Sequence, residues 1–319
     1  MMRAAALILA FAAPLPAGAL ELGLPIACTL GADCHIQNYY DDDPGAQARD
    51  FTCGPLVYDT HDGTDFALPS LIAQAAGVGV LAAAAGTVRG TRDEMADILQ
   101  GSPGAPDVSG RECGNGLVLT HPDGWETQYC HMALGSIAVR PGDVVAAGDR
   151  LGQVGLSGQT EFPHLHLAVR QNGRAIDPFD PAAIPACGDT GADTLWSDPV
   201  GYVPGGLIAA GFADAVPEYD AVKAGTADIA LTRDSPALVM WALLFGGRAG
   251  DQVTLTVTGP AGMVVDHAEL LERTQAQLLR AAGLRTPAAG WPAGDYTGTA
   301  QLIRDGAIVD AMTWTVRLD

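Results

Sequence analysis

The sequence has few cations and no long apolar run. Its 319 residues contain one lysine among 17 Lys plus Arg, against 37 Asp plus Glu, for a formal net charge of −20. Nucleic acids and anionic membrane surfaces both require a basic patch, so this balance argues against either as a partner. No stretch reaches the roughly 20 unbroken apolar residues of a membrane helix, so no membrane span is expected.

The first 19 residues are typical of an export signal. Met-Met-Arg is followed by an apolar run over 4–13 and by the small residues Ala17-Gly18-Ala19. A charged start, a short apolar stretch and an A-x-A ending are the parts of a secretory signal peptide. We therefore expect the mature protein to be periplasmic or secreted.

The cysteines show no C-x-x-C pair, so a cysteine-based zinc site or redox motif has little support. The six positions are Cys28, Cys34, Cys53, Cys113, Cys130 and Cys187. An even number in an exported chain favours disulfides, although six cysteines allow 15 pairings. We expect one pair in particular, Cys113 with Cys130, because they flank a predicted hairpin with the turn Pro122-Asp123-Gly124.

The stretch 162–169, Phe-Pro-His-Leu-His-Leu-Ala-Val, is the most informative in the chain. In a β-strand, His164 and His166 point to one face and the leucines to the other. Two imidazoles about 7 Å apart suit a metal ligand with a catalytic neighbour. The alternative is a pair of solvated surface histidines.

Two further segments supply candidate partners for these histidines. His61 and Asp65 are four residues apart, and a bend at Gly63 could bring both side chains to one metal. His131 lies in the predicted strand 125–132, where alternation places Tyr129 and His131 on the same face. Each pattern is weak when taken alone.

Together these motifs resemble the lysostaphin-type (LytM-like) zinc endopeptidases that cut peptidoglycan peptides. The resemblance covers about residues 58–181 and rests on four motifs in the family's order and spacing. They are His61-x-x-x-Asp65, the strand with Tyr129-Cys130-His131-Met132, the V-x-P-G-D-V-V-A-A-G-x-x-L-G-x-V-G run over 139–155, and His164-Leu165-His166. One departure is Glu161-Phe162-Pro163, where the family usually has Gly-Pro.

The resemblance implies zinc bound by His61, Asp65 and His166, with His131 and His164 as catalytic non-ligands. It also implies an antiparallel β-sheet domain that hydrolyses peptidoglycan peptide stems by attack of a zinc-bound water on the amide. If the source is Gram-negative, a D-Ala–diaminopimelate cross-link is a better target than a glycine bridge. The alternatives are a catalytically silent wall-binding or regulatory module, and an adhesion protein that works through its C-terminal region.

The predicted organisation is mostly β. After the signal, residues 20–57 form an irregular disulfide-tied segment, 58–183 the endopeptidase domain, 184–199 a linker, and 200–319 an immunoglobulin-like β-sandwich. A polar loop over 89–113 should form a rim, with a short helix near 93–99. Residues 266–282 fit helix or strand. No metal-ligand cluster follows Cys187, so we expect the sandwich to bind or to act as a spacer rather than to catalyse.

Overall fold

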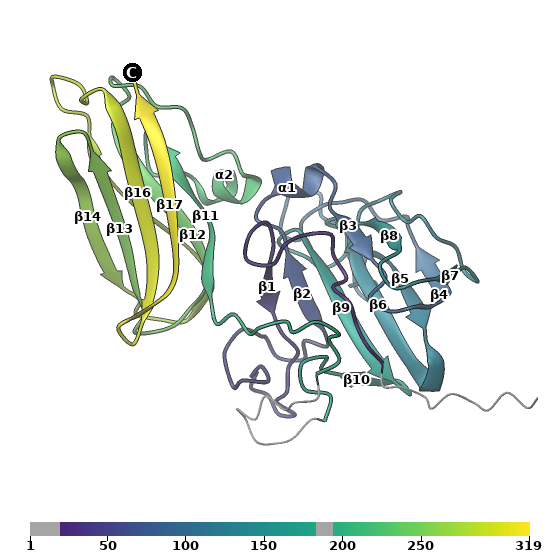
Figure 1. Ribbon diagram of the computed structural model, residues 1–319. Helices are drawn as coiled ribbons and strands as arrows, with labels where there is room; N and C mark the ends of the chain where they lie inside the picture. The colour runs from purple at the N-terminus through teal and green to yellow at the C-terminus, as the bar shows by residue number, and fades with distance from the viewer. Residues whose placement is uncertain (1–19, 183–193) are drawn as a thin grey trace, which may run out of the picture.

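A computed structural model describes residues 20–182 and 194–319, as a sheet-based N-terminal part and a C-terminal sandwich (Figure 1). The predicted signal segment 1–19, Cys187 and most of the predicted linker lie outside the described residues. The described chain is mostly β, and the pairs between its strands of two or more residues are all antiparallel, which confirms the prediction of a mostly β, antiparallel fold. Among the described residues, no helix combines the length and apolar character that crossing a membrane would require.

The N-terminal part is built on one eight-stranded sheet. Its strands in spatial order are β1 (His35–Asn38), β2 (Thr64–Ala67), β9 (His164–Gln171), β6 (Trp125–Met132), β5 (Asn115–Thr120), β4 (Gly86–Arg92) and β7 (Val144–Val145), with β10 (Arg174–Ile176) also paired to β9. Strand β9 is central, and its odd-numbered residues Leu165, Leu167 and Val169 are completely buried in the core beneath the sheet. The alternation read from the sequence therefore gives this strand one apolar face and one face with histidines.

Smaller elements complete this part of the chain. They are the two-stranded sheet of β3 (Gly79–Leu81) and β8 (Arg150–Gln153), helix α1 (Leu71–Ala75) and a 3₁₀ turn at Pro122–Gly124. Ser70 caps helix α1, because its hydroxyl accepts a hydrogen bond from the backbone N–H of Ala73.

The segment before residue 58 is more regular than predicted. Strand β1 pairs with β2 and forms one edge of the main sheet. Cys28 and Cys34 are joined by a disulfide just before it. The expectation of an irregular lead-in was therefore wrong for 35–38, a run of four residues too short to show a period.

The hairpin of β5 and β6 carries the predicted disulfide. Cys113 and Cys130 are bonded, with their Cα atoms 4.8 Å apart, which confirms that pairing. The loop before β5 has no helix at 93–99, contrary to expectation. Its carboxylates instead accept backbone hydrogen bonds, Asp93 from Gly135 and Asp97 from Leu134 and Leu156. These bonds fix the loop to the turns that follow β6 and β8.

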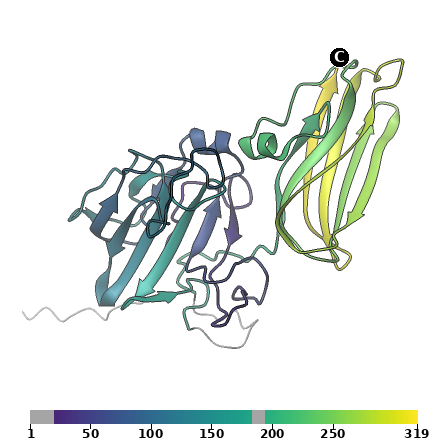
Figure 2. The same ribbon diagram turned by 180° about the vertical axis from the view of Figure 1, so that it is seen from behind.

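The C-terminal part consists of two antiparallel sheets packed face to face (Figure 2). One contains β11 (Gly206–Ala213), β12 (Ala237–Gly247) and β15 (Gln275–Arg285), and the other contains β14 (Gly262–Leu270), β13 (Gln252–Gly259), β16 (Gly294–Arg304) and β17 (Ala307–Leu318). Helix α2 (Tyr219–Ala224) lies between β11 and β12 in the chain. The ambiguous stretch 266–282 therefore covers the end of β14, the connection 271–274 and the start of β15.

The two parts contact each other along β1. The ring centroids of His35 and Phe245 are 4.5 Å apart. The amide of Gln37 donates to the carbonyl of Ala276 at 3.1 Å, and Gln277 donates to Gln37 at 2.9 Å. An apolar ring contact and paired amides thus join the edge of the main sheet to the sandwich.

The His35 contact predicts sensitivity to acid. Burial lowers the pKa of His35 to about 4, and its hydrogen bond to Gln37 offsets this only in part. In the unfolded chain a histidine titrates near 6.5, so between about pH 6.5 and 4 the unfolded state binds more protons. Stability should therefore fall as the pH is lowered through this window.

A His35→Phe variant, which keeps a ring against Phe245, should lose less stability than the wild type between pH 7 and pH 4.5. Urea unfolding at several pH values measures the difference, and His267→Gln on the exposed surface of β14 is the control. Equal pH slopes for wild type and His35→Phe would contradict the prediction.

Candidate metal centre

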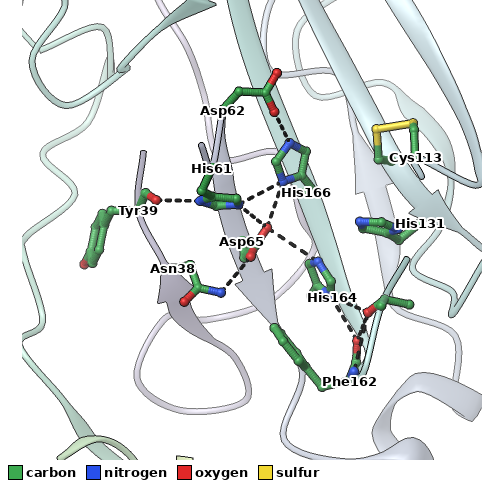
Figure 3. Close-up of polar contacts among 12 residues, drawn as sticks. Asn38, Tyr39, His61, Asp62, Asp65, Cys113, His131, Phe162, His164 and His166 are labelled. Atoms are coloured by element: carbon green, nitrogen blue, oxygen red, sulfur yellow. Dashed lines mark hydrogen bonds and ion pairs between the residues drawn. A yellow bond between two sulfur atoms is a disulfide. The ribbon is translucent and has the colours of Figure 1, made fainter. Parts of the chain in front are cut away.

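The side chains of His61, Asp65 and His166 converge on one point (Figure 3). His61 Nε2 is 3.1 Å from Asp65 Oδ1 and 3.1 Å from His166 Nδ1, and His166 Nδ1 is 2.9 Å from Asp65 Oδ1. All three side chains are largely buried, with His166 the most accessible at 12%. The structure thus brings together the residues that the sequence proposed as ligands.

Strand pairing accounts for this convergence. Asp65 on β2 and His166 on β9 are direct cross-strand partners, so their side chains rise from the same face of the sheet. His61 arrives from the turn before β2. In that turn a Cβ at Gly63 would lie 2.7 Å from His166 Nε2, so only glycine lets the chain pass this close to the imidazole.

The far side of each candidate ligand is held by a second group. His61 Nδ1 donates to the carbonyl of Tyr39 at 2.6 Å, and Asn38 donates to Asp65 Oδ2 at 2.9 Å. His166 Nε2 lies 3.3 Å from Asp62 Oδ1. Such outer partners fix ring orientation and tautomer, which leaves the near atoms as electron-pair donors. Asn38 is the last residue of β1, and Tyr39 follows it directly.

This donor set fits a divalent cation of the zinc type. Two imidazole nitrogens and one carboxylate oxygen are ordinary zinc ligands, and tetrahedral coordination at about 2.0–2.2 Å separates ligand atoms by about 3.3 Å. The observed separations of 2.9–3.1 Å are close to that value. Among the described residues, the other group of comparable density is Cys28, Asp33 and Cys34, whose cysteines are already joined in a disulfide.

His131 and His164 lie beside this triangle, with ring centroids 4.5 Å apart. His164 Nδ1 donates to the carbonyl of Phe162 at 2.9 Å, and its Nε2 is 3.4 Å from Asp65 Oδ1. His131 Nδ1 donates to the carbonyl of Ser157 at 2.9 Å. Neither ring belongs to the three-ligand group, yet both border it.

The position of His131 corrects the prediction that it shares a face with Tyr129. Tyr129 is completely buried in the core, whereas His131 borders the candidate metal site. His131 has φ +60°, a left-handed conformation that interrupts the alternation of β6. A residue other than glycine in this region is strained, and such strain is found preferentially at functional positions.

The pKa values of several ionisable groups in the site are strongly shifted. Burial lowers the pKa of both His131 and His164. Burial by itself would lower the pKa of His166, but the hydrogen bonds to Asp62 and Asp65 have the larger effect and raise this pKa to about 9. The bond to His166 lowers the pKa of Asp62 to about 2. The carboxylates therefore favour positive charge at this point, which a bound cation would supply.

A cleft of about 750 Å³ opens next to the site. Asp65, His131 and His164 are among its lining residues, as is Phe162, whose ring stacks on His164 with centroids 4.4 Å apart. Neither Asn38 nor Asp62 was predicted from the sequence as a site residue. Only Asp62 had a signal there, namely its place next to His61.

Residues 59–178 match the family model of peptidase family M23. The chain contains an M23 domain. This match confirms the family resemblance drawn from the motifs.

Curated relatives match over parts of the M23 domain. The peptidoglycan DD-endopeptidase ShyA of Vibrio cholerae is 32% identical over 117 residues, which cover 37% of this chain and 22% of that protein. The DD-carboxypeptidase/endopeptidase Mpg of Neisseria meningitidis is 37% identical over 83 residues, covering 25% of this chain and 18% of the relative. The matched region thus spans less than a quarter of each of these relatives.

Among solved structures, a zinc containing peptidase from Vibrio cholerae aligns at 24% identity with a TM-score of 0.34. The alignment covers 50% of this chain and 39% of that one.

The outer partner of His166 yields a testable prediction. Asp62→Ala should lower zinc affinity about 10- to 100-fold, because losing such a partner frees the imidazole to rotate and makes it less basic. Asp59→Ala, which removes an exposed carboxylate three residues earlier in the chain, should leave affinity unchanged. Competition with a chromophoric chelator measures both values, and equal affinities would show that Asp62 does not support the site.

Proposed function

We propose that this protein is a periplasmic or secreted zinc-dependent endopeptidase that hydrolyses peptide cross-links of bacterial peptidoglycan. The observation that carries the proposal is the convergence of His61, Asp65 and His166, with His131 and His164 beside them in a cleft of the M23 domain. The names of the relatives, peptidoglycan DD-endopeptidase and DD-carboxypeptidase/endopeptidase, support the choice of substrate.

In this proposal His61 Nε2, Asp65 Oδ1 and His166 Nδ1 hold the zinc ion. Bound there, zinc would lower the pKa of a water molecule and polarise the amide carbonyl. With three protein ligands, one position remains for water or substrate. The outer bonds to Tyr39, Asn38 and Asp62 keep the ligand atoms in place before substrate arrives.

His131 and His164 would move the protons of the reaction. In both rings Nδ1 carries the hydrogen, because each donates it to a backbone carbonyl that can only accept. Nε2 therefore holds the lone pair of the neutral ring. It can take a proton from the nucleophile and, once protonated, can donate to the developing oxyanion or the leaving amine. Both rings are equipped for either role.

The complete set of candidate ligands and catalytic histidines supports hydrolysis over the silent wall-binding module. A module that only binds peptidoglycan has no need of buried histidines with fixed tautomers around a shared carboxylate. Retaining them is costly, because buried ionisable groups require compensating partners.

The division between ligands and catalytic histidines can be tested with two variants. His166→Ala should sharply reduce both bound zinc and activity. His131→Ala should keep close to one zinc per chain while kcat falls about 10²–10⁴-fold, the usual effect of losing a positioned acid–base group. Elemental analysis together with turnover on a cross-linked muropeptide gives both quantities.

Two controls complete this experiment. His267→Ala removes an exposed histidine of β14 and should change neither zinc content nor turnover. Wild-type activity on purified peptidoglycan should disappear with a chelator and return with zinc. Zinc loss in His131→Ala, or full zinc in His166→Ala, would overturn the ligand assignment, and a zinc-loaded wild type without hydrolytic activity would overturn the proposed function.

A further inference from the structure

The sandwich forms one wall of the cleft beside the candidate metal centre. Besides Asp65, His131 and His164, the cleft is lined by Tyr219 and Lys223 of α2 and by Ala276 and Gln277 of β15. A substrate lying over the two histidines would therefore meet side chains from the C-terminal part as well as from the M23 domain.

Hydrogen bonds hold this wall in place. Gln37, which is 2% exposed, bonds to both Ala276 and Gln277. The hydroxyl of Tyr219 donates to Gln277 Oε1 at 3.1 Å and so ties α2 to β15. At the end of α2, a Cβ at Gly225 would lie only 2.7 Å from Ser70 Oγ, so the helix also packs closely against the start of α1.

The charges around the cleft are uneven. Its carboxylates are Asp65, Asp107, Glu112 and Glu161. Among the described residues that line it, Lys223 is the one Lys or Arg, and it is the only lysine in the whole sequence. Of the charged side chains that line the cleft, the carboxylates repel an anionic group and Lys223 attracts it.

The ammonium group of Lys223 has capacity for such a ligand. Its Nζ lies 3.2 Å from Asp220 Oδ1, but the Asp220 side chain is 94% exposed. An exposed ion pair of this kind is weak. Nζ also lies 5.0 Å from the centroid of the Tyr219 ring, which orients the side chain without using a hydrogen. The ammonium has three donors, so hydrogens remain for a further acceptor.

We propose that Lys223 binds a carboxylate of the peptide substrate and that the sandwich thereby forms part of the substrate-binding cleft. The inference rests on the proposed peptidoglycan endopeptidase function. The substrate class is a stem peptide with a free carboxylate near the scissile amide, such as a cross-link in which diaminopimelate keeps its carboxylate. A peptide with a carboxamide at the same place offers no charge to Lys223.

The test compares two cross-linked stem peptides that differ only in a diaminopimelate carboxylate or carboxamide. Binding to the full chain is measured by calorimetry in the zinc-loaded His131→Ala background, which slows cleavage. The carboxylate form should bind about three- to tenfold more tightly, as expected for a partly exposed charge-assisted hydrogen bond. Lys223→Met should abolish this preference and Lys223→Arg should retain most of it, since both residues are good helix formers.

Arg317→Gln, on the exposed surface of β17, is the matched control for the loss of one positive charge. It should keep the full preference. The proposal is overturned if Lys223→Met weakens both peptides equally, if it changes neither, or if the starting protein shows no preference.

Measurements of turnover distinguish a failure of the Lys223 site from a failure of the proposed hydrolytic function. In the active enzyme, Lys223→Met should raise KM for the carboxylate peptide with kcat unchanged, and leave KM for the carboxamide unchanged. If the wild type binds with a Lys223-dependent preference but cleaves neither peptide, the proposed hydrolytic function is contradicted and the carboxylate site at Lys223 is supported. If it cleaves both peptides and Lys223→Met changes nothing, the carboxylate site is contradicted and the proposed hydrolytic function is supported.

Discussion

The pairing of β2 with β9 is the interaction on which the candidate centre depends. Its register places Asp65 opposite His166, and the same pairing aligns Phe66 with Leu165 in the core. A slip of one residue would turn the histidines of β9 into the core and its leucines toward the cleft. Burial of that apolar face therefore selects the register, and the register assembles two of the three candidate ligands. Folding and site geometry have one physical cause here.

The sequence could predict the parts of the site that follow from local periodicity. The H-L-H alternation and the Gly63 bend required only neighbouring residues, and both appear in the structure. Tyr39 and Asn38 could not be predicted, because they reach the site only when β1 joins the edge of the sheet. The side chain of His131 turns toward the site because His131 itself has a left-handed backbone conformation at the end of β6. The regular alternation of a strand does not predict such a residue. In 266–282, tertiary pairing overrode a helical composition.

The contribution of the sandwich was also hidden from the sequence, for a different reason. Metal ligands are recognised because their residue types and spacing are unusual. A cleft wall consists of ordinary residues whose importance comes from their position, as with Gln277 against Gln37. The absence of a ligand cluster after Cys187 is the reason that catalysis is not predicted for the sandwich. It gave no information on whether this part contacts the substrate.

The net charge of −20 affects the long-range attraction of a ligand differently from its binding inside the cleft. At physiological ionic strength the Debye length is about 8 Å, so most surface carboxylates have little effect on a group held in the cleft. Over that distance the relevant charges are those of the lining residues and of a bound metal. A zinc ion coordinated there by one carboxylate would keep net positive charge, and Lys223 adds a second cationic point. An acidic protein can therefore lack affinity for long polyanions and still bind a short peptide through one carboxylate.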